Sequence, residues 1–227
     1  CLIVKDYIEL DVQLTSDGEV IVMHDSNAYR TTGVDENIAN MTYKEVRRLD
    51  AGSWYSVEYK GEKVPGLREV LELAQGKIKL NIELKPADNS EELARKTVAL
   101  IEKYNMENDC VITSFSSSAL SAAKSCDENI RVGYILSAAY GEYYDMKNID
   151  FFSVNAAFLS KRTIDAIHNS GKQVYAWTVN NKDSIKNLTN KGVDGVITDN
   201  PVLARETIYS RDTSETIINM IRYVFNQ

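Results

Sequence analysis

Cysteine, histidine and proline are scarce in this chain, and long apolar runs are missing from it. Its 227 residues include three cysteines, two histidines and three prolines. Cys1, Cys110 and Cys126 are too few for a disulfide framework and too widely spaced for a zinc motif. No apolar run approaches the roughly 20 residues that a membrane helix needs, and no signal peptide is visible at the start. We therefore expect no structural role for cysteine beyond core packing by Cys110.

The overall composition is that of an ordinary globular domain. Hydrophobic residues make up 44% of the chain and charged residues 26%, and 227 residues are enough for one large core. The net charge is −7 and the isoelectric point is about 5.0, which argues against nucleic acid as a partner. These features leave open whether the domain is cytoplasmic or tethered to a membrane.

The most informative stretch, residues 7–25, reads YIELDVQLTSDGEVIVMHD. Glu9 and Asp11 lie two residues apart in an apolar run, so a strand would point both carboxylates to the same side. A turn then leads into a second short strand, which ends at His24. Two neighbouring carboxylates repel one another unless a cation lies between them, and Mg²⁺ and Ca²⁺ prefer such oxygen ligands. An imidazole beside them can transfer protons at neutral pH.

Segments with strand character alternate with segments of helical periodicity. Parallel strands are predicted at residues 7–11, 79–84, 110–113, 131–136, 151–154, 174–178 and 195–198, with a hairpin strand at 19–23. Helices are predicted at 65–75, from 90, and at 117–124, 160–167, 185–192 and 202–209. This alternation predicts an α/β fold with a parallel sheet covered by helices. Seven parallel strands are one short of a (β/α)8 TIM barrel, and a doubly wound sheet is the alternative.

The residues at the strand ends favour the barrel. A barrel gathers the carboxyl ends of its strands around one mouth, which is where its active site lies. The residues at or near these ends are Glu9, Asp11, Glu83, Ser114, Asn155, Trp177, Asn180 and Asp199. Of the acidic residues late in the chain, Asp194 and Asp199 are expected to make structural hydrogen bonds, and His168 is expected to lie on the surface.

Two segments fall outside this alternation. Residues 27–65 form a small insertion after the ExD strand and its hairpin partner, with an aromatic cluster and a capping box of Thr42 and Glu45 that predicts a helix over 42–49. An insertion of this length often covers a site. Residues 211–227 are predicted to form an amphipathic helix that follows the main domain, residues 1–210.

The stretch ELDVQLTSDGEVIVMHD resembles the signature of the glycerophosphodiester phosphodiesterase family. The similarity continues, in the family's order, through RTTG, VPGLREVL, NIELK, SF, WTVN and GVDGVITDNP. The resemblance implies a (β/α)8 TIM barrel that hydrolyses glycerophosphodiesters to glycerol 3-phosphate and an alcohol. It also implies a small-molecule glycerophosphodiester as the partner and one divalent cation, Mg²⁺ or Ca²⁺, as the cofactor.

The resemblance assigns a metal role to three acidic residues. Glu9, Asp11 and Glu83 would bind the cation, although Glu83 could instead form an ion pair with Lys85, since both would lie on one face of a strand. Lys85 would bind the substrate phosphate as a point charge.

The resemblance also implies roles for an imidazole and an indole. His24 would be the catalytic general acid that protonates the leaving alkoxide, and the alternative is a hydrogen-bonded loop histidine. Trp177 would bind substrate by packing on the glycerol, and a plain core position is the alternative.

The family's first strand carries an HR motif whose histidine is the second catalytic imidazole, and this chain contains no HR motif. The resemblance therefore begins after the first strand, and the 227 residues alone are expected to be inactive. A membrane segment ahead of them is conceivable, and the oligomeric state is not indicated. Two other functions remain open: a degenerate, non-catalytic barrel that acts as a binding module, and a phospholipase-D-like lyase acting on lipid phosphodiesters.

Overall fold

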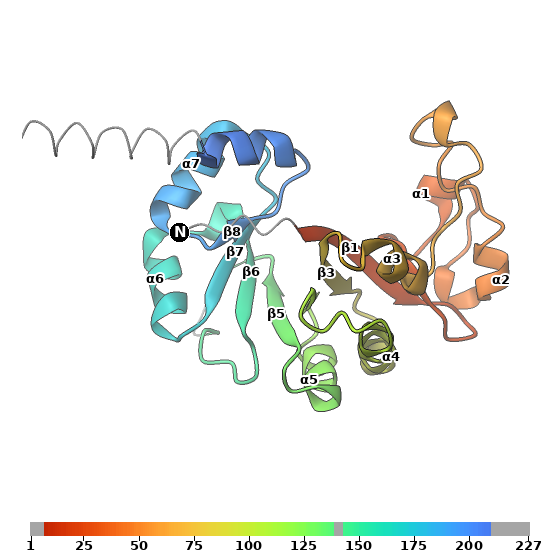
Figure 1. The fold of residues 1–227 in the computed structure, drawn as a ribbon, viewed down its shortest axis with the longest axis horizontal. Helices are drawn as coiled ribbons and strands as arrows, with labels where there is room; N and C mark the ends of the chain where they lie inside the picture. The colour runs from red at the N-terminus through yellow and green to blue at the C-terminus, as the bar shows by residue number, and fades with distance from the viewer. Residues whose placement is uncertain (1–6, 139–142, 210–227) are drawn as a thin grey trace, which may run out of the picture. The chain divides into compact units, whose positions relative to one another are not determined.

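The computed structural model describes residues 7–138 and 143–209 (Figure 1). Within them the chain forms two compact units, one that runs to Tyr134 and one that begins at Ile135. The predicted amphipathic helix over residues 211–227 lies outside the described residues. None of the helices described is both long and apolar enough to cross a membrane.

The amino-terminal unit is built on a mostly parallel sheet. Its strands are β1 (Tyr7–Leu14), β2 (Val20–Val22), β3 (Lys79–Leu84), β4 (Cys110–Ser114) and the first four residues of β5 (Arg131–Leu136). They are arranged in the order β2-β1-β3-β4-β5, and only β2 runs antiparallel to its neighbour. The predicted hairpin and parallel strands of this half are therefore confirmed. β1 is longer than predicted because its pairing with β2 extends the ladder to Leu14.

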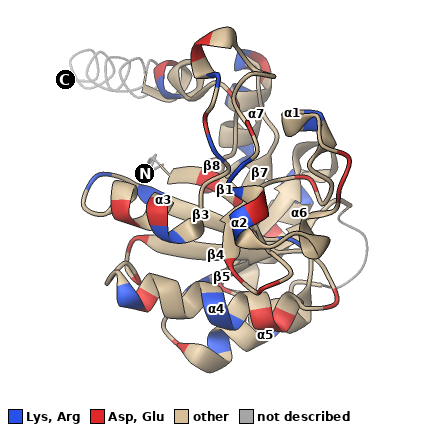
Figure 2. Ribbon diagram, turned by 90° about the vertical axis from the view of Figure 1, so that its right-hand side faces the viewer, with Lys and Arg blue, Asp and Glu red and all other residues tan. Residues whose placement is uncertain are grey.

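Three helices accompany this sheet: α3 (Leu67–Ala74), α4 (Ser90–Lys103) and α5 (Ser117–Cys126). Apolar side chains recur on one face of each helix, and α4 buries Leu93, Val98 and Ile101 completely or nearly so. Each such side chain contributes roughly 1.5–3 kcal/mol by leaving water. Acidic and basic residues are interspersed along α4, whereas α5 carries a single charged residue, Lys124 (Figure 2). Cys110 is buried, which confirms it as a core residue.

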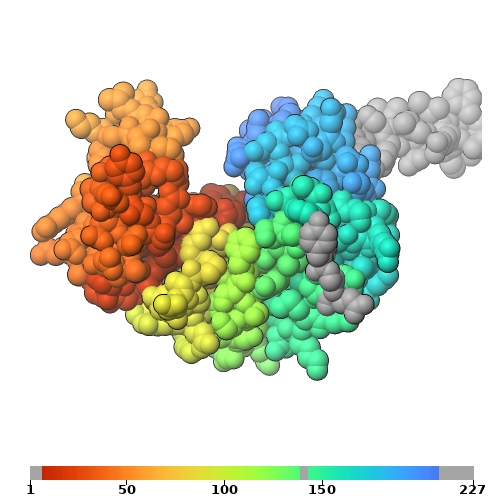
Figure 3. Space-filling model, turned by 180° about the vertical axis from the view of Figure 1, so that it is seen from behind, coloured from red at the N-terminus to blue at the C-terminus, as the bar shows by residue number. Residues whose placement is uncertain are grey.

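The insertion between β2 and α3 has a core of its own. It contains α1 (Tyr29–Thr32), η1 (Ile38–Asn40), α2 (Tyr43–Val46) and η2 (Val57–Tyr59). The predicted capping box is present, although the helix it begins is shorter than 42–49. The insertion forms the orange lobe of the amino-terminal unit in Figure 3. Its buried cluster comprises Ile21, Met23, Ala28, Ile38, Met41, Val46 and Val64.

The carboxyl-terminal unit repeats the strand–helix alternation. Its parallel strands are β6 (Phe151–Asn155), β7 (Gln173–Trp177) and β8 (Gly195–Val196), with η3 (Ala156–Phe158), α6 (Lys161–Asn169) and α7 (Lys182–Lys191). Residues 201–209 are helical as predicted. β8 ends earlier than predicted, because the Thr198 hydroxyl and the Asp199 backbone amide donate hydrogen bonds to the side-chain oxygen of Asn180.

The two late aspartates make the structural hydrogen bonds that were expected. Asp194 accepts from the backbone amide of Val174 at 2.8 Å and pairs with the His168 Nε2 at 2.9 Å. Asp199 accepts from the side chain of Asn180 at 2.6 Å. His168 is exposed, as predicted, and its pairing with Asp194 gives it a structural role on the surface.

A single carboxylate organises the tip of the insertion. Asp50 accepts hydrogen bonds from the backbone amides of Gly52, Ser53 and Gly61 and from the Ser53 hydroxyl. These donors lower the pKa of Asp50 well below its ordinary value, and the bonds from Ser53 contribute most. The ionised form of Asp50 therefore holds the loop from residue 50 to residue 61 together.

We expect the substitution Asp50→Asn to lower the thermal unfolding midpoint at pH 7 by several degrees. Folding lowers the pKa of Asp50, so its stabilising effect is present above the ordinary value of 3.8 and is lost as the pH falls below it. The wild-type and variant midpoints should therefore converge in acid, as measured by calorimetry across pH. Asp88→Asn is the control, since this exposed carboxylate has no hydrogen bond or ion pair within the described residues. A constant difference at every pH would contradict the assignment.

Candidate functional site

Three carboxylates from two neighbouring strands meet in the amino-terminal unit. Glu9 and Asp11 project to the same side of β1, and parallel pairing places Asp11 directly opposite Glu83 on β3. Oxygen atoms of these three residues all lie within 4.8 Å of one another. Glu9 is the most exposed of the three, and the side chains of Asp11 and Glu83 are largely buried. The strand register therefore brings together the three acidic residues that the sequence analysis selected.

The proximity of these carboxylates disfavours their charges. The pKa of Glu9 rises to about 7, first because the group is partly removed from water and then because Asp11 and Glu83 are negative. Desolvation also raises the pKa of Glu83, although a hydrogen bond and the positive charge of Lys85 oppose the effect. The cluster thus retains negative charge that its protein surroundings offset only in part.

Lys85 follows β3 and forms a bridge between two of the carboxylates. Its Nζ lies 2.7 Å from an oxygen of Asp11 and 2.8 Å from an oxygen of Glu83. Burial opposes its charge, but the hydrogen bonds with Asp11 and Glu83 raise the pKa of Lys85 overall. The ion pair between Lys85 and Glu83, which was the predicted alternative to a metal role for Glu83, is present. The ion pair between Lys85 and Asp11 was not predicted.

The cluster has the donors and the dimensions that a hard divalent cation requires. Mg²⁺ binds oxygen at about 2.0–2.1 Å and Ca²⁺ at about 2.3–2.6 Å, so oxygens around one ion lie no more than about 4–5 Å apart. The three carboxylates satisfy this limit. The raised pKa of Glu9 independently indicates that further positive charge would be favourable there. Glu9, Asp11 and Glu83 could therefore hold a metal ion together.

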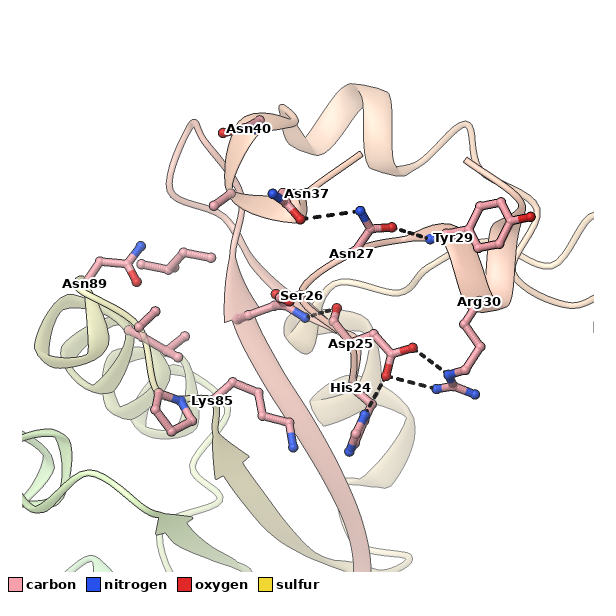
Figure 4. A pocket seen from close by; sticks show the side chains of 16 residues that line it. His24, Asp25, Ser26, Asn27, Tyr29, Arg30, Asn37, Asn40, Lys85 and Asn89 are labelled. Atoms are coloured by element: carbon pink, nitrogen blue, oxygen red, sulfur yellow. Dashed lines mark hydrogen bonds and ion pairs between the residues drawn. The ribbon is translucent and has the colours of Figure 1, made fainter. Parts of the chain in front are cut away.

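His24 follows β2 and is oriented by an ion-paired carboxylate (Figure 4). Its Nδ1 lies 2.7 Å from Asp25, and Asp25 also binds the Nε and Nη2 of Arg30. The hydrogen bond from Arg30, followed by that from His24, lowers the pKa of Asp25. An ionised carboxylate only accepts hydrogen bonds, so the His24 proton that faces it is on Nδ1. The Nε2 atom of His24 is left for other contacts.

Arg30 connects this pair to the insertion. Its guanidinium lies 5.3 Å from the ring centre of Trp54, a cation–π contact, and the Trp54 indole donates to the carbonyl of Ala51. Neither Asp25 nor Arg30 was predicted as a site residue. Asp25 adjoins His24, and Arg30 opens the RTTG motif, so both signals were present in the sequence.

A pocket of about 860 Å³ opens beside His24 and Lys85. One wall comes from the ends of β1 and β2, another from the loop and short helices of the insertion, and a third from the start of α4. Lys85 lines this pocket and also contacts the acidic cluster, and His24 is close enough to Glu83 for its charge to lower the pKa of that carboxyl. The lining residues are Gln13, Leu14, His24, Asp25, Ser26, Asn27, Tyr29, Arg30, Asn37, Ala39, Asn40, Lys85, Pro86, Ala87, Asn89 and Leu93.

Trp177 belongs to the carboxyl-terminal unit, where it is the last residue of β7. It is half-buried, and its indole Nε1 donates to the carbonyl of Ser153 at 3.0 Å. This hydrogen bond fixes the ring at the end of its strand. The contact with glycerol that the sequence analysis predicted for Trp177 stays a prediction.

The chain is similar to known phosphodiesterases. The sequence profile of the glycerophosphoryl diester phosphodiesterase family matches residues 5–203. A glycerophosphodiester phosphodiesterase of Caldanaerobacter subterraneus subsp. tengcongensis is 31% identical over 227 residues, which cover 96% of this chain and 86% of that protein. One from Bacillus subtilis is 31% identical over 219 residues, with 87% and 75% covered.

Among solved structures, a phosphodiesterase of Oleispira antarctica in complex with the product sn-glycerol-3-phosphate has a TM-score of 0.85 at 30% identity. The alignment covers 89% of this chain and 85% of that one. A glycerophosphodiester phosphodiesterase of Agrobacterium tumefaciens has a TM-score of 0.72 at 26% identity, with 88% and 86% covered. Together with the alternating strands and helices, these neighbours identify a TIM-barrel-like α/β fold.

We expect Lys85→Met to destabilise the metal-free chain by about 2–3 kcal/mol, because the substitution leaves two largely buried carboxylates without their positive partner. Added Ca²⁺ or Mg²⁺ should then raise the unfolding midpoint of the variant more than that of the wild type. The matched control is Lys79→Met at the first residue of β3, whose half-exposed pair with Asp109 should contribute within about 1 kcal/mol. Equal effects of the two substitutions would count against the cluster as a special site.

Proposed function

The chain belongs to the glycerophosphoryl diester phosphodiesterase family, and we propose that it uses a divalent cation to hydrolyse glycerophosphodiesters to glycerol 3-phosphate and an alcohol. The observation that carries this proposal is the meeting of three carboxylates beside a lysine and an oriented imidazole. The solved relative that binds sn-glycerol-3-phosphate supports the proposed product.

Glu9, Asp11 and Glu83 are the proposed ligands of Mg²⁺ or Ca²⁺. When bound, such an ion supplies positive charge that offsets the phosphate diester and the charge that develops on it in the transition state. Lys85 contributes a second positive charge at the edge of the same cluster, where its ammonium group can contact a phosphate oxygen. The proposed phosphate position therefore lies where Lys85 and the acidic cluster meet.

His24 is the proposed general acid. Water adds its oxygen to phosphorus, and the bond from phosphorus to the oxygen of the alcohol breaks. The Nε2 proton of His24 passes to that oxygen, so the alcohol leaves neutral. The water gives up one proton to solvent, and His24 regains its own from solvent, which balances the reaction. Trp177 is the proposed contact for glycerol in the substrate.

Asp25 is proposed as a positioning residue for His24. Because its carboxylate holds the Nδ1 proton, the ring keeps Nε2 available for proton transfer. Arg30 keeps Asp25 ionised and in place, and Trp54 supports Arg30 from the insertion. In this proposal the insertion helps to orient the general acid.

The family match does not favour the other two functions, a non-catalytic binding module and a phospholipase-D-like lyase on lipids. The absence of the first barrel strand and inactivity of the 227 residues alone remain predictions. They can be tested by assaying the chain both as it is and with a strand bearing an HR motif added before Cys1.

We expect the chain with the added HR-bearing strand, the form used in the activity assays below, to release glycerol 3-phosphate from glycerophosphoglycerol, as followed by a coupled dehydrogenase assay. A chelator should abolish the activity, and Mg²⁺ or Ca²⁺ should restore it. Glu9→Gln and Glu83→Gln should each lower kcat/KM by about 100-fold or more, because each removes a charged ligand. Asp109→Asn, in the half-exposed pair with Lys79, is the control. Hydrolysis that survives both the chelator and Glu9→Ala would rule out the metal-dependent mechanism.

We expect the effect of His24→Ala to depend on the leaving group. Glycerol leaves as a strongly basic alkoxide and needs a proton, whereas nitrophenolate leaves without one. The variant should therefore lose about 100-fold or more on glycerophosphoglycerol but much less on bis(p-nitrophenyl) phosphate. Asp25→Asn should show the same pattern to a lesser degree and alter the pH–rate profile. Equal losses on both substrates would show that His24 is not the general acid.

A further inference from the structure

The pocket beside His24 continues well beyond the residues that the reaction uses. Its volume of about 860 Å³ extends from His24 and Lys85 to the amino end of α4 and to the insertion around Asn37 and Asn40. Figure 4 shows Asn89 on the α4 side and Asn37 and Asn40 on the opposite side. This outer part of the pocket has space for a group attached to the phosphate.

The position of the proposed general acid determines which half of the substrate enters this space. A general acid must lie within hydrogen-bond reach of the oxygen that leaves. His24 lines the pocket, while Glu9, Asp11 and Glu83 do not line it. A diester whose leaving oxygen lies at His24 therefore extends its alcohol into the pocket, provided that the proposed function holds.

The outer pocket presents neutral amides with unused hydrogen-bonding atoms. The Asn40 Nδ2 donates a hydrogen bond to the Glu36 carboxylate, which leaves the side-chain oxygen of Asn40 as an acceptor. The Asn37 oxygen accepts from Asn27, which leaves its NH₂ group as a donor. In Figure 4 that nitrogen is turned away from Asn27, toward the side where Asn89 lies. A hydroxyl group both donates and accepts, so it complements this arrangement.

Asn89 adds a third amide from the other wall. It occupies the N-cap position of α4 but makes no capping hydrogen bond with its side chain. Within the described residues its side-chain amide has no hydrogen-bond partner, although the residue is half-buried. The amide of Asn89 is not sealed from solvent, so it is able to bind water in the free protein and a polar ligand in a complex.

The same lining is poorly suited to cationic or apolar alcohols. Asp25 is the only carboxylate in the lining, and it is already paired with His24 and Arg30. Apart from the His24 imidazole, Tyr29 is the only aromatic ring among the described lining residues, whereas quaternary ammonium groups are recognised by several rings together. Its two leucines, Leu14 and Leu93, are buried and leave no broad apolar wall for an acyl chain.

We propose that this pocket receives the leaving alcohol and selects a neutral polyol, such as glycerol, over choline. Asn37, Asn40 and Asn89 supply the selecting hydrogen bonds. A site built to bind hydroxyl groups rejects a ligand without them, because its own polar groups are then left without partners.

The test compares glycerophosphoglycerol with glycerophosphocholine, which share one glycerol arm and differ in the alcohol. We expect kcat/KM to favour the first by about tenfold or more. Asn89→Leu should lower kcat/KM for glycerophosphoglycerol about fivefold, which corresponds to roughly one hydrogen bond, and should lower it less for glycerophosphocholine. Asn89→Asp adds a negative charge and should shift the preference toward the choline ester.

The matched controls are Asn108→Leu and Asn108→Asp. Asn108 is exposed in the loop before β4, at the amino ends of the strands, whereas the pocket lies at their carboxyl ends. These two variants should change neither rate. Circular dichroism of all four variants shows whether the fold is kept, and the Asn89→Asp shift is a gain that misfolding cannot produce. A choline ester that is hydrolysed as fast as the glycerol ester, or faster, would overturn the inference.

A binding measurement separates this inference from the proposed function. Saturation-transfer NMR detects each ester on the unmodified chain in the presence of Ca²⁺, whether or not it is hydrolysed. The pocket assignment predicts that glycerophosphoglycerol binds more strongly than glycerophosphocholine. Asn89→Leu should weaken that binding and Asn108→Leu should not. This result would support the pocket assignment even if neither ester were hydrolysed. In that case only the proposed activity would fail. Equal binding of the two esters would overturn the pocket assignment even in an active enzyme.

Discussion

Repulsion among three carboxylates is the constraint on which the site of this protein depends. Glu9, Asp11 and Glu83 are held together by the backbone pairing of β1 with β3, which their charges oppose. The hydrophobic core under these strands, including Val12, Ile82 and Leu84, keeps the register against that repulsion. Positive charge therefore stabilises the site by reducing the repulsion among the carboxylates. Lys85 supplies part of that positive charge.

The imidazole side of the site is held by the insertion. His24 lies at the end of a short strand and is exposed, so local structure alone would leave its ring free to rotate. The ion pair of Asp25 with Arg30 limits that rotation, and Arg30 itself packs on Trp54. Because the insertion has its own buried cluster, these contacts rest on a folded element rather than on a loose loop.

The same insertion forms one wall of the pocket and faces the start of α4 across it. Two parts of the chain about fifty residues apart thus place their amides around one space. The acidic cluster is anchored in the sheet, while the pocket wall is supplied by connecting segments. Changes in the insertion could alter the preferred alcohol without disturbing the strands that carry the carboxylates.

The sequence by itself determined the order of strands and helices, the capping box at Thr42, the burial of Cys110 and the selection of Glu9, Asp11 and Glu83. These features follow from local periodicity, short-range hydrogen bonds and recognisable motifs, which adjacent residues encode. Only the tertiary structure decided that Asp11 faces Glu83, that Lys85 bridges the two, that Arg30 fixes Asp25, and that Asn37 and Asn89 lie around one pocket. Those relations depend on strand register and on packing between distant segments, and no local pattern specifies the distance between two side chains that the fold alone brings together.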